Sequence, residues 1–245
     1  KSEDHRDHGN GRAAHVADKR DEAGCQKLKN SAQRNDAGIR SAEREHIASC
    51  LEEKLKEMKA NNSNLDVITF SGNGEPTGHP NFLEIVEDTI QLRNKYYPKA
   101  KVSVLTNSTL AHKPNVHRAL ELVDNNIMKL DTVDPEYIKK VNRPESSAFN
   151  VEEIIKQMQS FNGHVIIQTI FMHGTDDLGN DVSNTDDRYV IPWLEAIRRI
   201  KPSEVMIYTI DRDTPCTHLS KATHNELNAI RDRVAAEGFE CIAAY

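Results

Sequence analysis

Residues that suit the binding of a small charged ligand follow a short apolar run that ends near residue 70. The run at 65–71 leads into Gly72, Gly74, Glu75 and Pro76. Glycines leave backbone carbonyls and amides uncovered, and a carboxylate adds a fixed negative charge. Together these groups suit a ligand that carries an ammonium group. The alternative interpretation is a tight turn between a strand and a helix, because short glycine-rich loops are common turns.

Lys129 and Asp131 form a second pattern with chemical potential. They are two residues apart on an expected strand, so both side chains point to the same face, while Met128 and Leu130 point to the other. An ion pair without chemistry of its own is one interpretation. The other is a barrel lyase or aldolase in which Lys129 is the catalytic Schiff-base nucleophile.

Further polar residues lie at or near the ends of other expected strands. They are Asn107, Gln168 and Tyr208. Each is a weak signal alone, but together with Lys129 and Asp131 they predict a concave polar site for a small ligand. The chain contains neither GxxxxGK[ST] nor GxGxxG, so the sequence does not predict either of these phosphate-binding loops.

The elements that must position these residues alternate between strand and helix. Near-continuous apolar runs predict strands at 65–71, 101–106, 126–131, 164–171, 204–210 and 239–245. Helical spacing predicts helices at 41–60, 81–97, 114–123, 134–141, 151–161, 188–200 and 223–238. This alternation indicates an α/β fold with a parallel sheet covered by helices. An open doubly wound sheet and a (β/α) barrel both fit, and both place their sites at the carboxyl ends of the strands.

Composition divides the chain of 245 residues into two parts. Only Val16, Leu28, Ile39 and Ile47 represent Leu, Ile, Val, Met, Phe, Tyr and Trp in residues 1–50. We therefore expect a polar head at 1–50 that is disordered or non-native, followed by a folded body at 51–245. The net charge of -6 argues against a broad nucleic-acid footprint, and no apolar run is long enough to span a membrane.

The four cysteines are spread along the chain and form no close pair. They stand at Cys25, Cys50, Cys216 and Cys241. This spacing gives no disulfide framework, and we therefore expect a cytoplasmic protein.

The motifs, taken in order, resemble the radical S-adenosylmethionine (radical SAM) superfamily over about residues 51–245. TFSGNGEPTGHP (69–80) looks like the Gly-Gly-Glu-Pro motif of that family, with Asn73 between the glycines, and MKLDTVDPEYIKKVNRP (128–144) resembles its Lys-Leu-Asp segment. VLTNSTL (104–110), VIIQTIF (165–171) and VMIYTIDRDTP (205–215) are similar to three further strand segments. The resemblance implies a partial (β/α)6 barrel, here expected to lack its first strand.

The resemblance also implies cofactors and roles for individual residues. Gly72, Gly74 and Glu75, with neighbouring Pro76, would hold the methionine ammonium of S-adenosylmethionine. Asn107, Asp131 and Gln168 would meet the ribose hydroxyls and the carboxylate, and Tyr208 with Ile207 would lie against the adenine. In that family a [4Fe–4S] cluster cleaves the sulfonium reductively, and the resulting 5′-deoxyadenosyl radical oxidises or modifies a substrate. An electron donor such as flavodoxin or ferredoxin is implied as a partner.

The cysteine motif that holds the cluster in that family, CxxxCxxC, is absent from this sequence. Three explanations remain open at the level of the sequence. The head is the product of a reading-frame or assembly error, or the chain is a degenerate member that binds S-adenosylmethionine without a cluster, or other ligands such as His5, His8 or Cys25 replace the missing thiolates.

Overall fold

The computed structural model describes residues 13–15, 43–71, 74–144, 149–211 and 218–245. The chain divides into two compact units. The first unit consists of Lys1–Val104 with Leu122–Asp124, and the second consists of Leu105–Glu121 with Asn125–Tyr245. The boundary predicted at residue 50 from composition stays a prediction.

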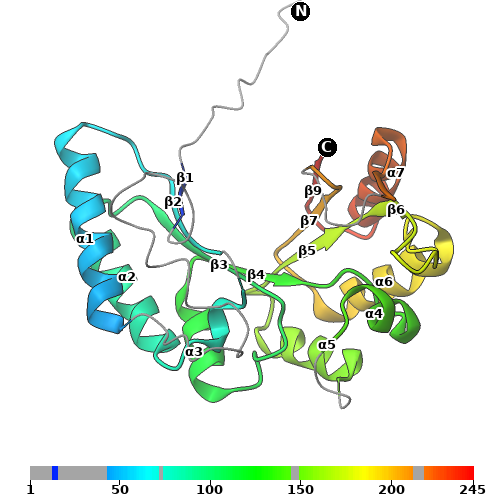
Figure 1. Cartoon of the computed structure of the whole chain (residues 1–245), viewed down its shortest axis with the longest axis horizontal. Helices are drawn as coiled ribbons and strands as arrows, with labels where there is room; N and C mark the ends of the chain where they lie inside the picture. Colours follow the sequence, from blue (N-terminus) through cyan, green and yellow to red (C-terminus); the bar gives the residue numbers. More distant parts are fainter. Residues whose placement is uncertain (1–12, 16–42, 72–73, 145–148, 212–217) are drawn as a thin grey trace, which may run out of the picture. The chain divides into compact units, whose positions relative to one another are not determined.

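Three parallel strands and two long helices make up the described part of the first unit (Figure 1). The strands are β1 (Ala13–His15), β2 (Val67–Phe70) and β3 (Lys101–Thr106), of which β3 runs two residues into the second unit. Ile68 of β2 pairs with Ala14 on one side and with Val102 on the other. The helices are α1 (Arg44–Ala60) and α2 (Phe82–Tyr96), with a short 3-10 turn, η2 (Pro76–Gly78), between β2 and α2.

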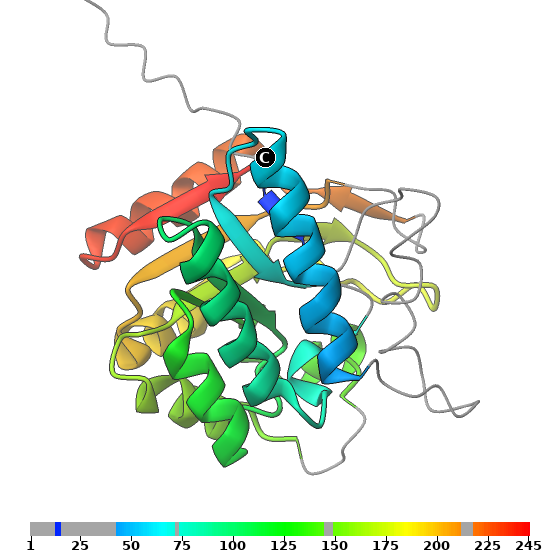
Figure 2. The same ribbon diagram turned by 90° about the vertical axis from the view of Figure 1, so that its left-hand side faces the viewer.

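The core of the first unit lies between α1, α2 and β2. Leu51 and Leu55, one turn apart on α1, are buried against Leu65 and Ile68. Figure 2 shows α1 in front of β2, in line with this packing. Arg44 of α1 binds the Asp88 carboxylate on α2 through two hydrogen bonds of 2.6 and 2.7 Å, which fixes the two helices to each other. The predicted helix at 41–60 and strand at 65–71 are therefore confirmed.

The structure differs from the sequence prediction at the first strand. No strand was expected ahead of residue 65, yet Ala13–His15 pairs in parallel with Val67–Thr69. A strand of three residues at a sheet edge is held by main-chain hydrogen bonds, so it requires no apolar run that a sequence pattern could show. Residues 44–50 of the predicted head are not disordered, because they form the first two turns of α1, in which Ile47 is buried. The disorder expected for residues 1–12 and 16–42 concerns positions outside the described part of the chain.

The second unit contains four parallel strands in the order β4, β5, β7 and β9 (Figure 1). Their bounds are Asn125–Lys129, Ile166–Ile170, Glu204–Tyr208 and Cys241–Ala244. Five helices connect or flank them, namely α3 (Pro114–Leu122), α4 (Pro135–Val141), α5 (Val151–Ser160), α6 (Asp187–Ile200) and α7 (His224–Ala236). Two short antiparallel strands, β6 (Met172–Gly174) and β8 (Leu219–Lys221), follow β5 and β7. The predicted alternation of strand and helix is confirmed.

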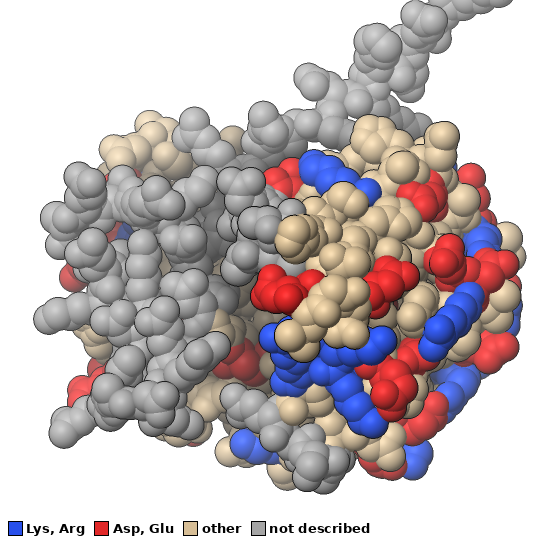
Figure 3. Space-filling model, turned by 45° about the vertical axis from the view of Figure 1, so that its right-hand side comes forward, with Lys and Arg blue, Asp and Glu red and all other residues tan. Residues whose placement is uncertain are grey.

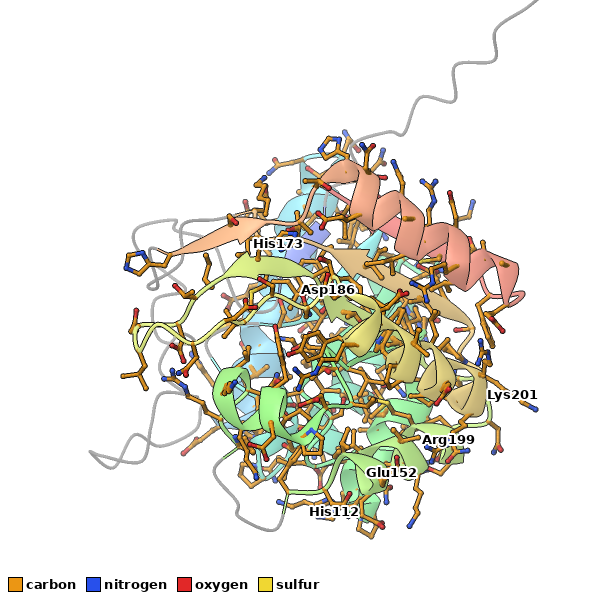
Figure 4. The ribbon with its side chains drawn as sticks, turned by 90° about the vertical axis from the view of Figure 1, so that its right-hand side faces the viewer. His112, Glu152, His173, Asp186, Arg199 and Lys201 are labelled. Carbon is orange, nitrogen blue, oxygen red and sulfur yellow. The ribbon has the colours of Figure 1, made fainter. Side chains whose placement is uncertain are left out.

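Helix ends in the second unit are fixed by caps and ion pairs. Thr223 and Glu226 form a capping box at the start of α7, where the helix predicted at 223–238 begins. Arg199 of α6 and Glu152 of α5 point toward one another and share two hydrogen bonds of 3.1 and 2.6 Å (Figure 4). Among the coloured residues of Figure 3, Lys and Arg side chains lie among Asp and Glu side chains.

None of the helices in the described residues is long and apolar enough to cross a membrane.

Candidate functional site

The register of the parallel strands places a row of side chains on one face of the second unit. Lys129 of β4 pairs with Gln168 of β5, which pairs with Met206 of β7. Asp131 and Tyr208, each two residues further along the chain, point to the same side because strand side chains alternate. We call these five residues the open face, since all of them except Asp131 are partly exposed. The shared face that the sequence predicts for Lys129 and Asp131 is present.

Asp131 is the most tightly held residue of the open face. Its side chain is only 2% exposed and accepts a hydrogen bond on each oxygen. The backbone N–H of Ile170 on β5 donates to Oδ1 at 3.2 Å, and the side-chain amide of Asn142 donates to Oδ2 at 3.0 Å. Lys129 Nζ lies 3.2 Å from the same Oδ2. The buried carboxylate therefore connects β4, β5 and the end of α4, and its charge is compensated as a buried charge requires.

The Lys129 side chain is partly exposed to solvent, and its ammonium forms an ion pair with Asp131. The side chain is 38% exposed. Burial opposes the charged ammonium, but attraction to the Asp131 carboxylate outweighs it and raises the pKa of Lys129 above its usual range. At neutral pH the open face therefore carries a fixed cation, which suits an anionic group such as a carboxylate.

Tyr208 and Gln168 add an aromatic ring and an amide to the same face. Burial raises the pKa of the Tyr208 hydroxyl, so this side chain stays neutral over the physiological range. A neutral phenol ring suits stacking against a planar heterocycle. The Gln168 amide offers both a donor and an acceptor, which suits hydroxyl groups.

The opposite face of the same strands is closed by helix α6. Met128, Leu130 and Ile207 point to this side and are at most 4% exposed. Trp193 Nε1 donates to the Leu130 carbonyl and to Thr169 Oγ1, both at 3.1 Å. The side chain of Ile207 therefore points away from the open face, and only its backbone could contact a ligand there. Its predicted place against an adenine ring stays a prediction, as do the other residue roles.

Asn107 lies on a turn that is hydrogen-bonded to β4. Its Oδ1 accepts hydrogen bonds from the backbone N–H and the hydroxyl of Thr109, at 3.0 and 2.7 Å. Ser108 has a positive φ of 71° and donates from its hydroxyl to the Lys129 carbonyl at 3.3 Å. The structure thus places the Asn107 turn beside Lys129, within the same unit.

The Gly-Asn-Gly-Glu-Pro segment belongs to the first unit. Gly72 lies outside the described residues, whereas Gly74 has a φ of 133°, in the range that favours glycine. Glu75 caps the turn η2, which begins with Pro76, by accepting hydrogen bonds from the backbone N–H and the hydroxyl of Thr77 at 3.2 and 2.6 Å. Glu75 thus caps a short turn, and its predicted contact with a ligand ammonium stays a prediction.

The two cysteines in the described part of the chain, Cys50 and Cys241, are not placed to bind a [4Fe–4S] cluster together. Such a cluster needs closely spaced thiolates, and the sequence has no CxxxCxxC. Cys50 lies near His46, with Sγ 3.7 Å from Nε2, while burial raises the pKa of the Cys241 thiol to about 12 and so disfavours its thiolate. Among the described residues, no three His, Cys, Asp or Glu side chains are placed to share a metal ion. Cys25, Cys216, His5 and His8 lie outside those residues.

A comparison with protein families decides the assignment. The sequence model of the Radical SAM superfamily matches residues 31–182, more than half of the chain. The chain belongs to the radical SAM superfamily. The UPF0026 protein slr1464 of Synechocystis is 34% identical over 155 residues, which cover 62% of this chain and 52% of that protein. A UPF0026 protein of Helicobacter pylori is 27% identical over 150 residues, which cover 60% and 45%. The chain thus spans about half the length of these curated relatives.

Solved structures of radical SAM proteins share the fold. A radical SAM methyltransferase of Sphaerobacter thermophilus superposes with a TM-score of 0.61 at 14% identity, over 84% of this chain and 58% of that one. Streptococcus suis SuiB bound to S-adenosylmethionine superposes with a TM-score of 0.60 at 16% identity, over 89% and 47%. At these identities the likeness concerns the fold alone, and it confirms the predicted α/β class of the radical SAM type.

One contact of the open face was missed by the sequence analysis. Asn142 follows Asp131 by eleven positions, and its amide reaches back to the carboxylate. The only local signal is its place at the end of a predicted helix, shortly before Pro144. That signal predicts a helix end but says nothing about the contact that the side chain makes.

Proposed function

We propose that this chain binds S-adenosylmethionine through the open face of the second unit, as the cofactor-binding part of a radical SAM enzyme. The observation that carries the proposal is the half-exposed Lys129 ammonium, held by buried Asp131 on the same face as Gln168 and Tyr208. Lys129 suits the carboxylate of the methionine moiety, the Gln168 amide suits the ribose hydroxyls, and the Tyr208 ring suits the adenine.

Two comparisons support this proposal. The superfamily to which the chain belongs consists of enzymes that use S-adenosylmethionine. SuiB, whose fold the chain shares, has been solved with S-adenosylmethionine bound.

The geometry modifies one predicted role, because both oxygens of Asp131 are engaged by protein groups. We therefore propose that Asp131 acts on the ligand through Lys129.

The reaction of the whole protein is a further part of the proposal. Radical SAM enzymes cleave S-adenosylmethionine reductively at a [4Fe–4S] cluster, with electrons from a donor such as flavodoxin or ferredoxin, and the radical then oxidises or modifies a substrate. The sequence lacks the CxxxCxxC spacing that holds this cluster in the superfamily. Cofactor binding by the open face is independent of iron in this proposal.

The Schiff-base alternative finds no support in the geometry. A lysine must be neutral to attack a carbonyl carbon, and enzymes achieve this by lowering the pKa of the amine. Attraction to Asp131 instead raises the pKa of Lys129, despite the opposing effect of burial. Lys129 is therefore suited to bind an anion as a cation, and not to act as an amine nucleophile at neutral pH.

Calorimetric titration of S-adenosylmethionine into the chain and its Lys129→Met variant tests the proposal. We expect saturable binding to the wild type and about tenfold or greater weakening in Lys129→Met, because a charge-assisted contact is lost. Lys156→Met is the matched control, since Lys156 forms an exposed ion pair with Glu153 at 2.7 Å on the outside of α5. Absence of binding to the wild type, or equal weakening in the control, would overturn the proposal.

A titration with protein prepared without iron separates cofactor binding from cluster binding. We expect S-adenosylmethionine to bind to this iron-free protein. A parallel anaerobic reconstitution with iron and sulfide measures whether the chain takes up a cluster. If S-adenosylmethionine bound only after uptake of a thiolate-ligated cluster, both the cysteine argument and iron-independent binding would be wrong.

A further inference from the structure

The amide of Asn142 contacts the centre of the open face from a separate element. Its Nδ2 donates to Oδ2 of Asp131 at 3.0 Å, and this oxygen also lies 3.2 Å from Lys129 Nζ. Asn142 itself is exposed, whereas the Asp131 side chain is 2% exposed. One neutral amide and one cation thus share the same buried oxygen.

The fold of α4 explains how Asn142 reaches back to the strand end. Asp134 caps the start of the helix by accepting a hydrogen bond from the Tyr137 N–H at 2.8 Å. At the other end, the backbone N–H groups of Asn142 and Arg143 both donate to the Ile138 carbonyl at 3.0 Å. Buried Tyr137 anchors the helix further, because its hydroxyl donates to the Val182 carbonyl at 2.8 Å. The helix is therefore fixed at both ends, and Asn142 is its C-cap.

The geometry limits how the carboxylate of Asp131 can rotate. The Ile170 N–H fixes Oδ1 and the Asn142 amide fixes Oδ2, so the plane of the carboxylate is set by two donors from different elements. Lys129 has a long flexible side chain, and an ion pair with a carboxylate of fixed orientation restricts its rotamers. If the Asn142 amide is removed, Oδ2 of Asp131 keeps only its contact with Lys129 out of these two. The carboxylate can then rotate, and the position of the Lys129 ammonium is less well defined.

We infer that Asn142 is a positioning residue of the S-adenosylmethionine site, where its amide fixes the Asp131 carboxylate and thereby holds the Lys129 ammonium toward the ligand. This inference rests on the proposed function. It assigns Asn142 and Asp131 no contact with the ligand, and it makes Lys129 the group of this network that touches the ligand.

Affinity for S-adenosylmethionine in the Asn142→Ala variant is the first test. We expect it to fall about five- to tenfold, in line with the loss of one hydrogen bond to a charged group. Asn162→Ala is the matched control, because Asn162 also follows the end of a helix and donates its amide to a backbone carbonyl, that of Ser160, at 3.2 Å. The φ of Asn162 is 50°, so alanine there also destabilises a helix end, yet we expect unchanged affinity. Equal weakening in both variants would reduce Asn142 to a structural role and overturn the inference.

The pH profile of the Asn142→Asp variant gives a readout that a merely structural role would not move. The introduced carboxyl lies against Oδ2, and like-charge repulsion raises its pKa. At about pH 5 it keeps its proton and donates to Oδ2 as the amide does, whereas at about pH 8 it is ionised, repels Oδ2 and competes for Lys129. We expect affinity close to the wild type at low pH and a loss of about tenfold or more at high pH. A pH profile parallel to that of the wild type would overturn the inference.

Acylation of the Lys129 amine, followed by mass spectrometry without any ligand, separates this inference from the proposed function. Only the neutral amine reacts, and Asp131 disfavours the neutral form of Lys129. We expect Asn142→Ala to accelerate acylation of Lys129 severalfold and leave that of Lys156 unchanged. If the wild type bound no S-adenosylmethionine but acylation still accelerated, the proposed function would fail while the positioning of Lys129 would stand. If binding occurred and neither affinity nor acylation responded to Asn142→Ala, the positioning inference alone would fail.

Discussion

Alternate residues of the same short segments form the two faces of strands β4, β5 and β7, yet one face is buried and the other is partly exposed. Met128, Ile167 and Ile207 are at most 1% exposed on the helix-covered face. One residue away along each strand, Lys129, Gln168 and Tyr208 are partly exposed on the open face. Because the side-chain period of a strand is two, the same strand contributes buried apolar side chains to one face and partly exposed polar side chains to the other.

The polar groups on the two faces differ in whether their hydrogen-bond partners lie inside the protein or in solvent. On the helix-covered face, Thr169 and Trp193 form a closed set of hydrogen bonds with the Leu130 carbonyl. On the open face, the Asp131 carboxylate is satisfied inside the protein, but Lys129 keeps a substantial part of its side chain in solvent. We therefore expect substitutions on the first face to lower the free energy of unfolding, and substitutions on the second to lower affinity for the ligand.

Replacement of the largest side chain on the helix-covered face has the largest expected effect on stability. Trp193→Ala removes a side chain that is 1% exposed and leaves the Leu130 carbonyl with fewer donors. We expect a loss of about 3–5 kcal/mol in the free energy of unfolding, measured by urea denaturation. Ile191→Ala, at a 44% exposed position of the same helix, serves as the control and should cost less than about 1 kcal/mol. Similar losses in both would contradict the closed packing of this face.

Asp131→Ala is expected to affect both stability and binding, because Asp131 is the buried member of the open face. The substitution leaves the Ile170 N–H and the Lys129 ammonium without their carboxylate partner. We expect a loss of about 2–3 kcal/mol in the free energy of unfolding and strongly reduced affinity for S-adenosylmethionine. Asp131→Asn, which retains an acceptor for the Ile170 N–H, should lose less stability. If both variants kept wild-type affinity, Lys129 would not depend on Asp131.

Lys129→Met should lower the free energy of unfolding by less than Asp131→Ala does, and the loss should depend on pH. The ion pair with Asp131 raises the pKa of Lys129, so its contribution to stability is present below about 10.4, the usual pKa of lysine, and is lost as pH rises through the higher folded value. Lys129 itself is partly exposed, but its loss leaves the buried Asp131 carboxylate without a cation, so we expect a loss of about 1–2 kcal/mol at neutral pH. Urea denaturation of the variant and the wild type at neutral and strongly alkaline pH measures the difference. If the difference in free energy of unfolding between the wild type and the variant grew from neutral to alkaline pH, this ion pair could not be its cause.

Tyr208→Phe is expected to have the smallest effect, because we assign the ring and not the hydroxyl to the ligand. Affinity for S-adenosylmethionine should change by less than about threefold, whereas Tyr208→Ala should weaken binding by about tenfold or more through the loss of stacking. Titration of the two variants side by side measures the contribution of the ring. Equal effects would show that the hydroxyl, not the ring, meets the ligand.

Elements whose residues are set by local pattern could be predicted from the sequence. The apolar runs around Met128 and Ile167 predicted strands, and Thr223 predicted the start of α7. The shared face of Lys129 and Asp131 followed from the period of two. These features depend on neighbours within a few positions, so the sequence contains the information that determines them.

Features that depend on tertiary contacts could not be predicted in the same way. The reach of Asn142 to Asp131 requires the whole helix α4 to fold back on the strand end. The short strand at Ala13–His15 exists through pairing with β2 and has no apolar pattern. The resemblance implies that Ile207 and Tyr208 both lie against the adenine, whereas adjacent strand residues point to opposite faces and the Ile207 side chain is 1% exposed.

Methyl NMR of the methionine side chains tests the central claim, that S-adenosylmethionine binds on the open face, most directly. The chain has five methionines, of which Met206 lies on the open face beside Gln168 and Met128 is fully buried on the helix-covered face. We predict that S-adenosylmethionine shifts the Met206 methyl signal in a saturable way and leaves the Met128 signal in place. A saturable shift of Met128 with Met206 unmoved, or no shift of either, would contradict the account.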